Sequence, residues 1–148
     1  VRVYASRYRL DTERGLVLAE LRGEDLEALP GIDQDAMRVV RYLPGIASNG
    51  LTARAHVRGG YENEVAVYFD GAPLFEPYHF KDFYAPLGML DPGAIGRVDF
   101  YSGVPPPRYG NRLSGVLDMT PREWSGRDRH ELGLSLLYAH ALSQGRLE

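Results

Sequence analysis

Glycine closes one β-prone run after another in this chain, and this restricts the fold more than any other feature of the sequence. The runs that read as short strands are residues 53–58, 65–70, 96–101 and 116–120. Glycines follow three of them, at positions 59–60, 71 and 103. Because glycine accepts the backbone angles of tight turns, the chain is predicted to turn sharply and form a compact mixed sheet.

The strand at residues 65–70 shows which face of this sheet is covered. Val65, Val67 and Phe69 alternate there with smaller or more polar residues. Alternation of this kind predicts a sheet that is buried mainly on one face.

Helices are predicted to be few and short. Asp33 is a suitable N-cap for a helix that Pro44 and Gly45 end. Its apolar positions recur at helical spacing: Ala36, Val39, Val40 and Leu43. Residues 22–29 carry acids early and predict a second short helix. Residues 1–5 and 16–21 are β-prone, with a polar turn at residues 11–15.

A long connection, residues 71–92, is rich in aromatic residues and proline. This connection is too long to be a simple link, and loops of this length are usually functional or disordered. Phe80 and Phe83 are expected to enter the core, whereas Tyr61, Tyr78 and His79 are expected to be more exposed. Tyrosine combines apolar area with a polar tip and suits a binding surface.

The last segment differs in kind from the rest. Residues 122–129 are polar, and from Glu131 to Leu142 large apolar residues alternate with small ones. The apolar side carries Leu132, Leu134, Leu136 and Tyr138. One strand of about ten residues with an apolar outer row is typical of an outer-membrane barrel. An ordinary amphipathic strand has the same pattern, so this segment alone leaves both interpretations open.

The composition excludes several classes of function. A net charge of -3 gives no sign of a basic face, which argues against a nucleic-acid partner. The chain has no cysteine, which excludes disulfides and thiolate chemistry. No phosphate-binding glycine loop or nucleophile elbow is present, and the four histidines are not spaced as a metal pair. We therefore expect no enzyme activity, no cofactor and no metal.

Four blocks in a fixed order resemble the plug domain of TonB-dependent outer-membrane receptors. They are EDLEALPGIDQDAMRVVRYLPGI (residues 24–46), HVRGG (56–60), VAVYFDGAPL (65–74) and IGRVDFYSGVPPPRYGNRLSGVLDMTPR (95–122). The resemblance implies an α+β fold, with a small mixed β-sheet, short flanking helices and long loops. It implies a plug over residues 1–122, then a linker and the first barrel strand over residues 123–146. Residues 147–148 are interpreted as a cloning scar.

The resemblance also implies partners and a location. The plug would sit inside its own C-terminal β-barrel in the outer membrane of a Gram-negative bacterium. It would gate active transport, be moved by TonB of the inner-membrane energising complex, and face a scarce ligand such as a siderophore, a cobalamin or a glycan. Because the chain begins at Val1 and shows no TonB-box segment, that segment is expected upstream.

Several residues match positions with a role in the family. Arg58 matches the arginine that holds the plug against acidic residues of the barrel, and Arg112 is a second candidate for this contact, since arginine suits forked pairing with carboxylates. Ligand-facing loops match residues 47–52, 60–64 and 75–80. The predicted ligand-binding residues are Asn49, Tyr61, Asn63, Tyr78 and His79. The chain departs from the family at Ser102-Gly103-Val104, where many members have Arg-Gly-Pro.

Three other interpretations stay open at this point. A freestanding periplasmic ligand-binding module would need a complete site within these residues. A hydrolase would use His79 with Asp70 or Asp82. A receptor that also signals would use movement of the plug to report ligand outside the cell.

Overall fold

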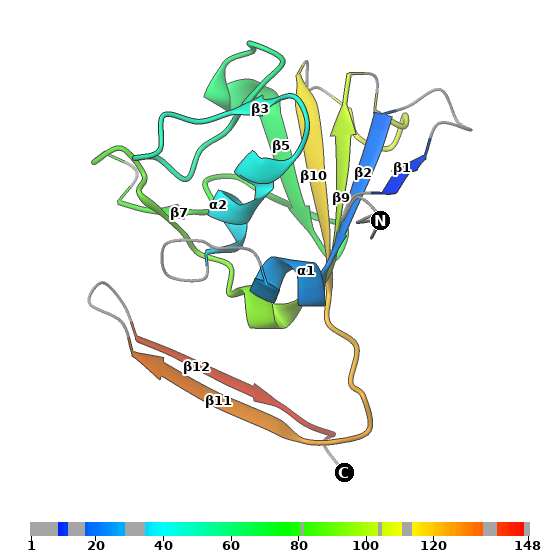
Figure 1. The fold of residues 1–148 in the computed structure, drawn as a ribbon, viewed down its shortest axis with the longest axis vertical. Coiled ribbons are helices and arrows are strands. Elements are labelled where there is room, and N and C mark those ends of the chain that lie inside the picture. The colour runs from blue at the N-terminus through cyan, green and yellow to red at the C-terminus, as the bar shows by residue number, and fades with distance from the viewer. Residues whose placement is uncertain are drawn as a thin grey trace, which may run out of the picture.

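The computed structural model describes residues 9–11, 17–28, 35–80, 82–103, 105–110, 114–134 and 139–146. Its largest element is a six-stranded mixed sheet in the order β1-β2-β9-β10-β5-β6 (Figure 1). These strands are β1 (Arg9–Asp11), β2 (Val17–Arg22), β5 (Val65–Phe69), β6 (Ala72–Leu74), β9 (Ile95–Ser102) and β10 (Gly115–Pro121). All neighbours are antiparallel except β5 and β10, which are parallel. The predicted α+β fold with a small mixed sheet is confirmed.

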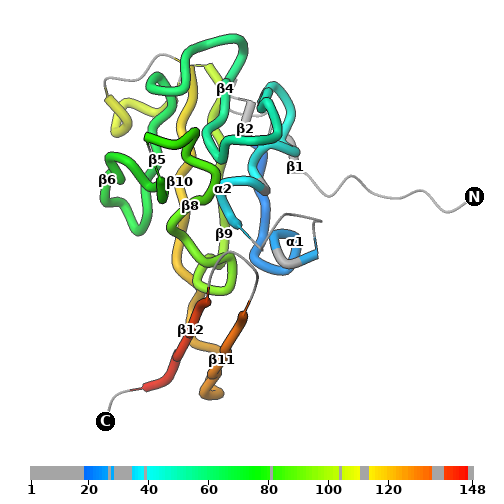
Figure 2. Tube along the Cα trace, turned by 90° about the vertical axis from the view of Figure 1, so that its left-hand side faces the viewer, coloured from blue at the N-terminus to red at the C-terminus, as the bar shows by residue number. Residues whose placement is uncertain are grey.

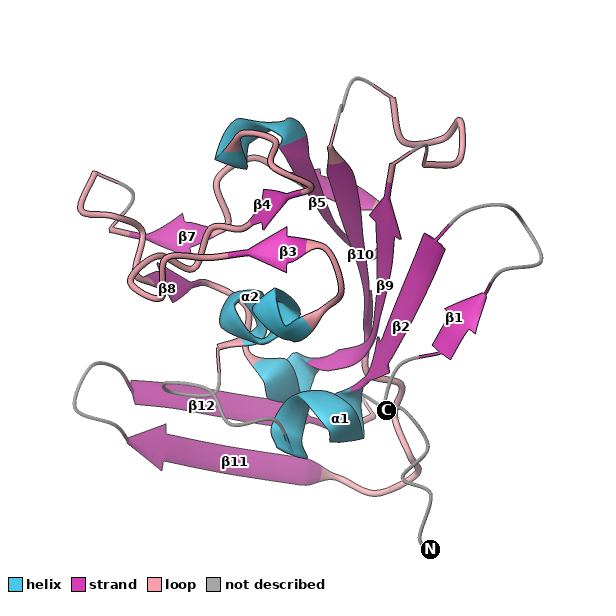
Figure 3. Ribbon diagram, turned by 45° about the horizontal axis from the view of Figure 1, so that its top comes forward, coloured by secondary structure: helices cyan, strands magenta, loops and turns pink. Residues whose placement is uncertain are grey.

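Short helices and two small sheets lie on one side of the large sheet (Figure 3). The helical elements are α1 (Gly23–Ala28), α2 (Ala36–Val39), and the 3-10 turns η2 (Val40–Tyr42), η3 (Glu62–Glu64) and η4 (Pro92–Ala94). The small sheets pair β3 (Ile46–Ala47) with β4 (His56–Val57), and β7 (Tyr78–His79) with β8 (Leu87–Gly88). No helix among the described residues has the length and apolar character needed to cross a membrane.

The main core lies between the large sheet and these elements. Leu26 of α1 and Met37 of α2 pack there against the sheet. Its largest fully buried side chains are Phe100, Leu21, Met37, Ile95, Leu117 and Met119. The opposite face of the sheet carries a second, smaller cluster of Ala66, Tyr101, Tyr109 and Val116. The prediction of burial mainly on one face is therefore only partly right, because tyrosines cover part of the second face.

The predicted helices agree with the structure except at one end. The helix at Ala36 continues through η2 as far as Tyr42. Its N-cap is Asp35, whose carboxylate accepts a hydrogen bond from the backbone N–H of Met37 at 2.8 Å. The predicted cap, Asp33, lies outside the described residues, as do residues 1–5 and most of the predicted turn at residues 11–15.

The predicted strand at residues 53–58 is wrong for most of its length, since only His56–Val57 form a strand. The backbone N–H of Ala53 donates to the carbonyl of Ala85 at 2.8 Å, and that of Arg54 donates to Thr52 Oγ1 at 3.0 Å. Hydrogen bonds within the loops thus satisfy the backbone N–H groups of Ala53 and Arg54, which would pair with a neighbouring strand if this segment lay in a sheet.

Phe80 and Phe83 are exposed, which contradicts their predicted place in the core. Their side chains are 67% and 79% accessible. The turn that carries them buries Ala85 instead, and Ala85 N–H donates to the carbonyl of Phe80 at 3.1 Å. A small residue closes the base of the turn, so the two rings are left at its tip.

The C-terminal segment forms a hairpin rather than one long strand. It pairs β11 (Arg129–Leu134) with β12 (Ala139–Gln144) at the end of the large sheet where β10 ends (Figure 2). Folding back satisfies the backbone groups that a single strand would leave unpaired. Leu132 and Leu134 point outward and are 89% and 90% accessible, as the predicted apolar row requires. Leu136 and Tyr138 lie outside the described residues.

Candidate functional site

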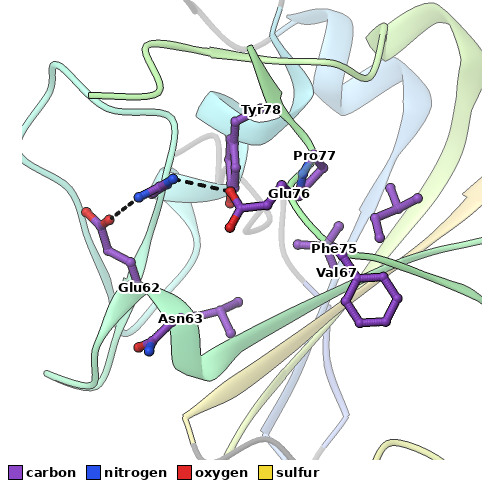
Figure 4. Close-up of a pocket in the computed structure, with 10 residues that line it drawn as sticks. Glu62, Asn63, Val67, Phe75, Glu76, Pro77 and Tyr78 are labelled. Atoms are coloured by element: carbon purple, nitrogen blue, oxygen red, sulfur yellow. Dashed lines mark hydrogen bonds and ion pairs between the residues drawn. The ribbon is translucent and has the colours of Figure 1, made fainter. Parts of the chain in front are cut away.

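A cavity of about 270 Å³ opens between the start of β5 and the segment that joins β6 to β7 (Figure 4). We call it the β5–β7 cavity. Its apolar lining is Val65, Val67, Leu74, Phe75 and Pro77. Its polar lining is Arg54, Glu62, Asn63, Glu76 and Tyr78. An apolar floor with a few polar groups at the rim is the usual composition of a small-molecule site.

Arg54 joins two walls of this cavity. Its Nη1 lies 3.4 Å from Glu62 Oε2 in η3, and its Nη2 lies 3.3 Å from Glu76 Oε2 in the β6–β7 segment. The guanidinium carbon also lies 5.6 Å from the centre of the Tyr78 ring. Arg54 therefore links its own loop to η3 through a charged hydrogen bond. It links the same loop to the chain at Glu76 and Tyr78 through a second charged hydrogen bond and a cation–π contact.

The backbone at Glu76 is unusual. Its φ of 143° falls in a region that residues other than glycine rarely adopt. Pro77, which follows, is buried. Strain of this kind persists only where the surroundings hold it, and here it places the Glu76 carboxylate against Arg54.

Tyr78 is held in place from the far side by α2. Asp35 accepts a hydrogen bond from the backbone N–H of Gly88 at 2.5 Å, and Gly88 is the β8 partner of Tyr78. A side chain at Gly88 would meet Met37 Cγ and Asp35 Oδ1 at 2.5 Å, so only glycine fits there. Burial raises the pKa of Asp35, and its backbone hydrogen bonds oppose that rise.

The hydroxyl of Tyr78 stays protonated throughout the physiological range. Burial raises its pKa well above the ordinary value of a tyrosine, and the guanidinium of Arg54 opposes this. The carboxylates of Glu62, Asp35 and Glu76 raise it further. Tyr78 can thus offer a neutral hydroxyl as well as the edge of an aromatic ring.

A second cavity of about 470 Å³ adjoins the first, and we call it the Arg58 niche. It is lined by Val57, Arg58, Gly59, Gly60, Tyr61, Glu64, Gly103 and Ser114. Arg58 itself has a left-handed backbone, with a φ of 50°, and its N–H donates to the carbonyl of Gly45 at 2.9 Å. Its side chain lies against Gly103, where an added Cβ would come within 3.1 Å of Nη1.

Two polar groups in the niche have no partner among the described residues. The guanidinium of Arg58 forms no hydrogen bond or ion pair within the part of the chain that the structure describes, and the buried Ser114 Oγ likewise forms no hydrogen bond. His56 separates the niche from the β5–β7 cavity: its Nδ1 lies 3.0 Å from the Gly60 carbonyl and its Nε2 lies 3.4 Å from Glu62 Oε1.

The structure brings some of the predicted ligand residues together and separates others. Asn63 and Tyr78 line the β5–β7 cavity, and Tyr61 lines the Arg58 niche. Asn49 and His79 line neither cavity. The Asn49 amide oxygen accepts from the backbone N–H groups of Leu51 and Thr52 at 3.0 and 3.1 Å, so it organises its own loop. Arg112 lies outside the described residues.

Arg54, Glu62 and Glu76 were not predicted as site residues from the sequence. Their sequence positions give no common pattern, because they come from three different connections. The one available signal is that Arg54 interrupts a run of small residues, Ala53 and Ala55, that are buried. Charge in such a run indicates a side chain with a specific partner.

The arrangement that a hydrolase would need is not formed. No hydrogen bond or ion pair joins His79 to Asp70 or Asp82, and the structure describes all three residues. Nor do three or more metal-ligating side chains meet anywhere within the described ranges.

Comparison with known families decides the identity of the fold. Residues 18–116 match the model of the TonB-dependent Receptor Plug Domain. The chain belongs to this plug family. The two cavities accordingly lie within a plug domain, at the end of its sheet where β5 begins.

Solved structures of similar fold include a siderophore receptor and an outer membrane transporter. The siderophore receptor PirA from Pseudomonas aeruginosa is 21% identical, with a TM-score of 0.56 over 76% of this chain and 20% of that one. The outer membrane transporter YddB from Escherichia coli is 16% identical, with a TM-score of 0.59 over 76% of this chain and 18% of that one. FpvA of P. aeruginosa, solved with pyoverdines, is 18% identical, with a TM-score of 0.57 over 81% of this chain and 16% of that one.

This plug chain spans about a fifth or less of the length of those receptors. At such identities the likeness establishes the fold. A search among curated proteins found no match.

Proposed function

We propose that this plug is the movable gate of an outer-membrane active-transport receptor. It would occlude the lumen of its own C-terminal β-barrel and contribute loops to the binding of a scarce extracellular ligand. TonB of the inner-membrane energising complex would move it to admit that ligand. The observation that carries this proposal is the match of residues 18–116 to the plug family.

The Arg58 niche supports a contact with the barrel wall. A guanidinium and a buried hydroxyl, each without a partner among the described residues, face a space with glycine at three of its edges, Gly59, Gly60 and Gly103. A wall carboxylate could approach closely there and accept from both groups, as forked arginine pairing favours. We propose that Arg58 holds the plug in this way, with Ser114 assisting and Arg112 as a second contact.

The β5–β7 cavity supports a role in ligand binding. Its polar residues Asn63 and Tyr78 offer an amide and a neutral hydroxyl next to apolar area. We propose that they form the plug's share of the ligand site, with Tyr61, Asn49 and His79 on the neighbouring loops. The plug would carry out no chemistry, since the energy of transport would come through TonB.

The gate proposal is tested in the full-length receptor in its outer membrane. Deletion of residues 18–116 should leave an open barrel that admits vancomycin, an antibiotic too large for ordinary porins. Transport through that barrel should also lose its dependence on TonB. A deleted receptor that still excludes vancomycin would contradict the proposal. Recovery of the intact protein in the soluble periplasm would instead favour a freestanding binding module.

A point variant tests the niche within the same assay. Arg58→Ala should loosen the plug and raise vancomycin entry to a level between the intact and the deleted receptor. Arg127→Ala removes an exposed arginine from the segment between β10 and β11 and serves as the matched control. If vancomycin enters equally through the two variants, Arg58 does not hold the plug against the barrel wall.

A further inference from the structure

We infer that the β5–β7 cavity takes a small amphipathic organic cation, an amine or a guanidinium joined to an apolar body. The inference rests on the proposed function, because it names the class of ligand that this face of the plug would meet. PirA, one of the structures of similar fold, is a siderophore receptor, whereas the argument for a cation comes from the charges and shape of this cavity.

The charged side chains that line the cavity are Arg54, Glu62 and Glu76. Two carboxylates therefore face one guanidinium, and both already lie close to it, at 3.4 and 3.3 Å. An entering anion would meet the two carboxylates and an arginine whose charge they offset. An entering cation would meet the excess of negative charge, and the Glu76 side chain is 61% exposed and therefore open to it.

Tyr78 lies beside the same charges at the polar rim. Burial is the main cause that raises the pKa of its phenol, the guanidinium of Arg54 opposes this rise, and the carboxylates of Glu62, Asp35 and Glu76 add to it. The face of the Tyr78 ring that Arg54 approaches shows that this ring accepts a cation.

The remaining lining determines the rest of the ligand. Val65, Val67 and Leu74 form an apolar floor, and Phe75 extends it. A volume of about 270 Å³ lies just below the usual range for drug-sized ligands. The apolar body should thus be a single ring or a short alkyl chain, with its charged end toward Glu62 and Glu76.

Three probes that share one apolar body separate charge from shape: phenethylammonium, phenethyl alcohol and hydrocinnamate. Each is titrated into the 148-residue chain while the labelled methyl NMR signals of Val65, Val67 and Leu74 are followed. Phenethylammonium should bind most tightly and hydrocinnamate most weakly, about tenfold apart, as partly exposed charges imply.

Charge-neutral variants locate the source of the preference. Glu76→Gln and Glu62→Gln should each bring the three affinities closer together. Glu123→Gln makes the same change at an exposed residue of the segment after β10 and should leave them unchanged. A thermal unfolding curve for each variant verifies that it is folded, and having two cavity variants keeps the test valid if one of them is not.

Four results would overturn the inference: equal binding of the three probes, tighter binding of hydrocinnamate, no methyl shift with any probe, or a preference that both cavity variants retain. The vancomycin test uses none of these probes. A negative titration therefore leaves the gate proposal intact, and a failed vancomycin test leaves the measured charge preference intact.

Discussion

The two faces of the six-stranded sheet come from the same strands, yet different kinds of side chain cover them. On the face toward the helices, Ala19, Phe100, Leu117 and Val67 stand opposite one another across β2, β9, β10 and β5. One residue along each strand, on the other face, the same row reads Glu20, Asp99, Asp118 and Tyr68. The alternation of side chains along each strand thus assigns residues to two faces of the sheet. It does not determine which elements cover each face.

The second face is held by polar contacts and rings. Tyr109 donates its hydroxyl to Asp118, and its ring lies 5.0 Å from that of Tyr68 and 5.4 Å from that of Tyr101. Arg108 lies over the Tyr109 ring at 4.6 Å. The helix face depends on apolar burial and the second face on hydrogen bonds and charge, so different substitutions should weaken them.

The largest effect is expected on the helix face. Phe100→Ala leaves a cavity beneath the helices, because Phe100 is fully buried, and should lower the free energy of unfolding by about 3–5 kcal/mol. Thr120→Ala, on the second face of β10, serves as the control and should cost less than about 0.5 kcal/mol. Denaturant unfolding of both variants measures the difference, and similar losses would show that the two faces do not differ as described.

A smaller effect is expected from the tyrosine cluster. Tyr109→Phe keeps the ring and removes the hydroxyl that Asp118 accepts from, so it should cost about 1–2 kcal/mol. Tyr68→Phe removes a hydroxyl from the neighbouring ring, whose hydroxyl has no hydrogen bond among the described residues, and should cost little. If Tyr109→Phe unfolds at the same denaturant concentration as the unaltered chain, hydrogen bonding does not hold this face.

The smallest predicted effect is an increase in stability when Asp99 is replaced by asparagine. Burial raises the pKa of Asp99 above its ordinary value of 3.8, Arg97 opposes this, and Glu20 and Asp118 add to the rise. The folded chain therefore binds this proton more readily than the unfolded chain, and ionisation of Asp99 lowers stability as pH rises above 3.8. Asp99→Asn should stabilise by about 0.2–1 kcal/mol near neutral pH, because it removes a buried charge and the repulsion between opposed carboxylates.

That gain should disappear as the pH falls toward 3.8, where the unaltered side chain also becomes neutral. Melting curves across this range measure it, with Glu24→Gln on the exposed side of α1 as the control. A gain that is the same at every pH would mean that charge on Asp99 is not its source.

Much of the fold could be predicted because its signals are local. Gly71 and Gly103 mark the ends of β5 and β9, and the spacing of Ala36, Val40 and Leu43 marks the helix. The pairing of β5 with β10 could not be predicted from either strand, since each has the same alternation whichever neighbour it takes. The exposure of Phe80 depends on Ala85 closing the turn, which is a contact rather than a pattern.

The candidate site was predicted less well for the same reason. Tyr78 and Asn63 were predicted because their loops match the ligand-facing loops of the plug family, and both line the β5–β7 cavity. Arg54 acquires its role only when folding brings Glu62 and Glu76 to it from two other connections. No spacing of residues in the sequence predicts this contact of Arg54 with Glu62 and Glu76.

The parallel pairing of β5 and β10 has a consequence for the order in which the domain folds. Strand β10 lies between β9 and β5, and it pairs residues 115–119 with residues 65–69. A chain that emerges from its N-terminus therefore lacks the middle of this sheet until most of the domain has appeared. Contacts between such distant segments slow folding. Until β10 inserts, β5 and β9 have unpaired edges, and during this interval the chain would most need a chaperone.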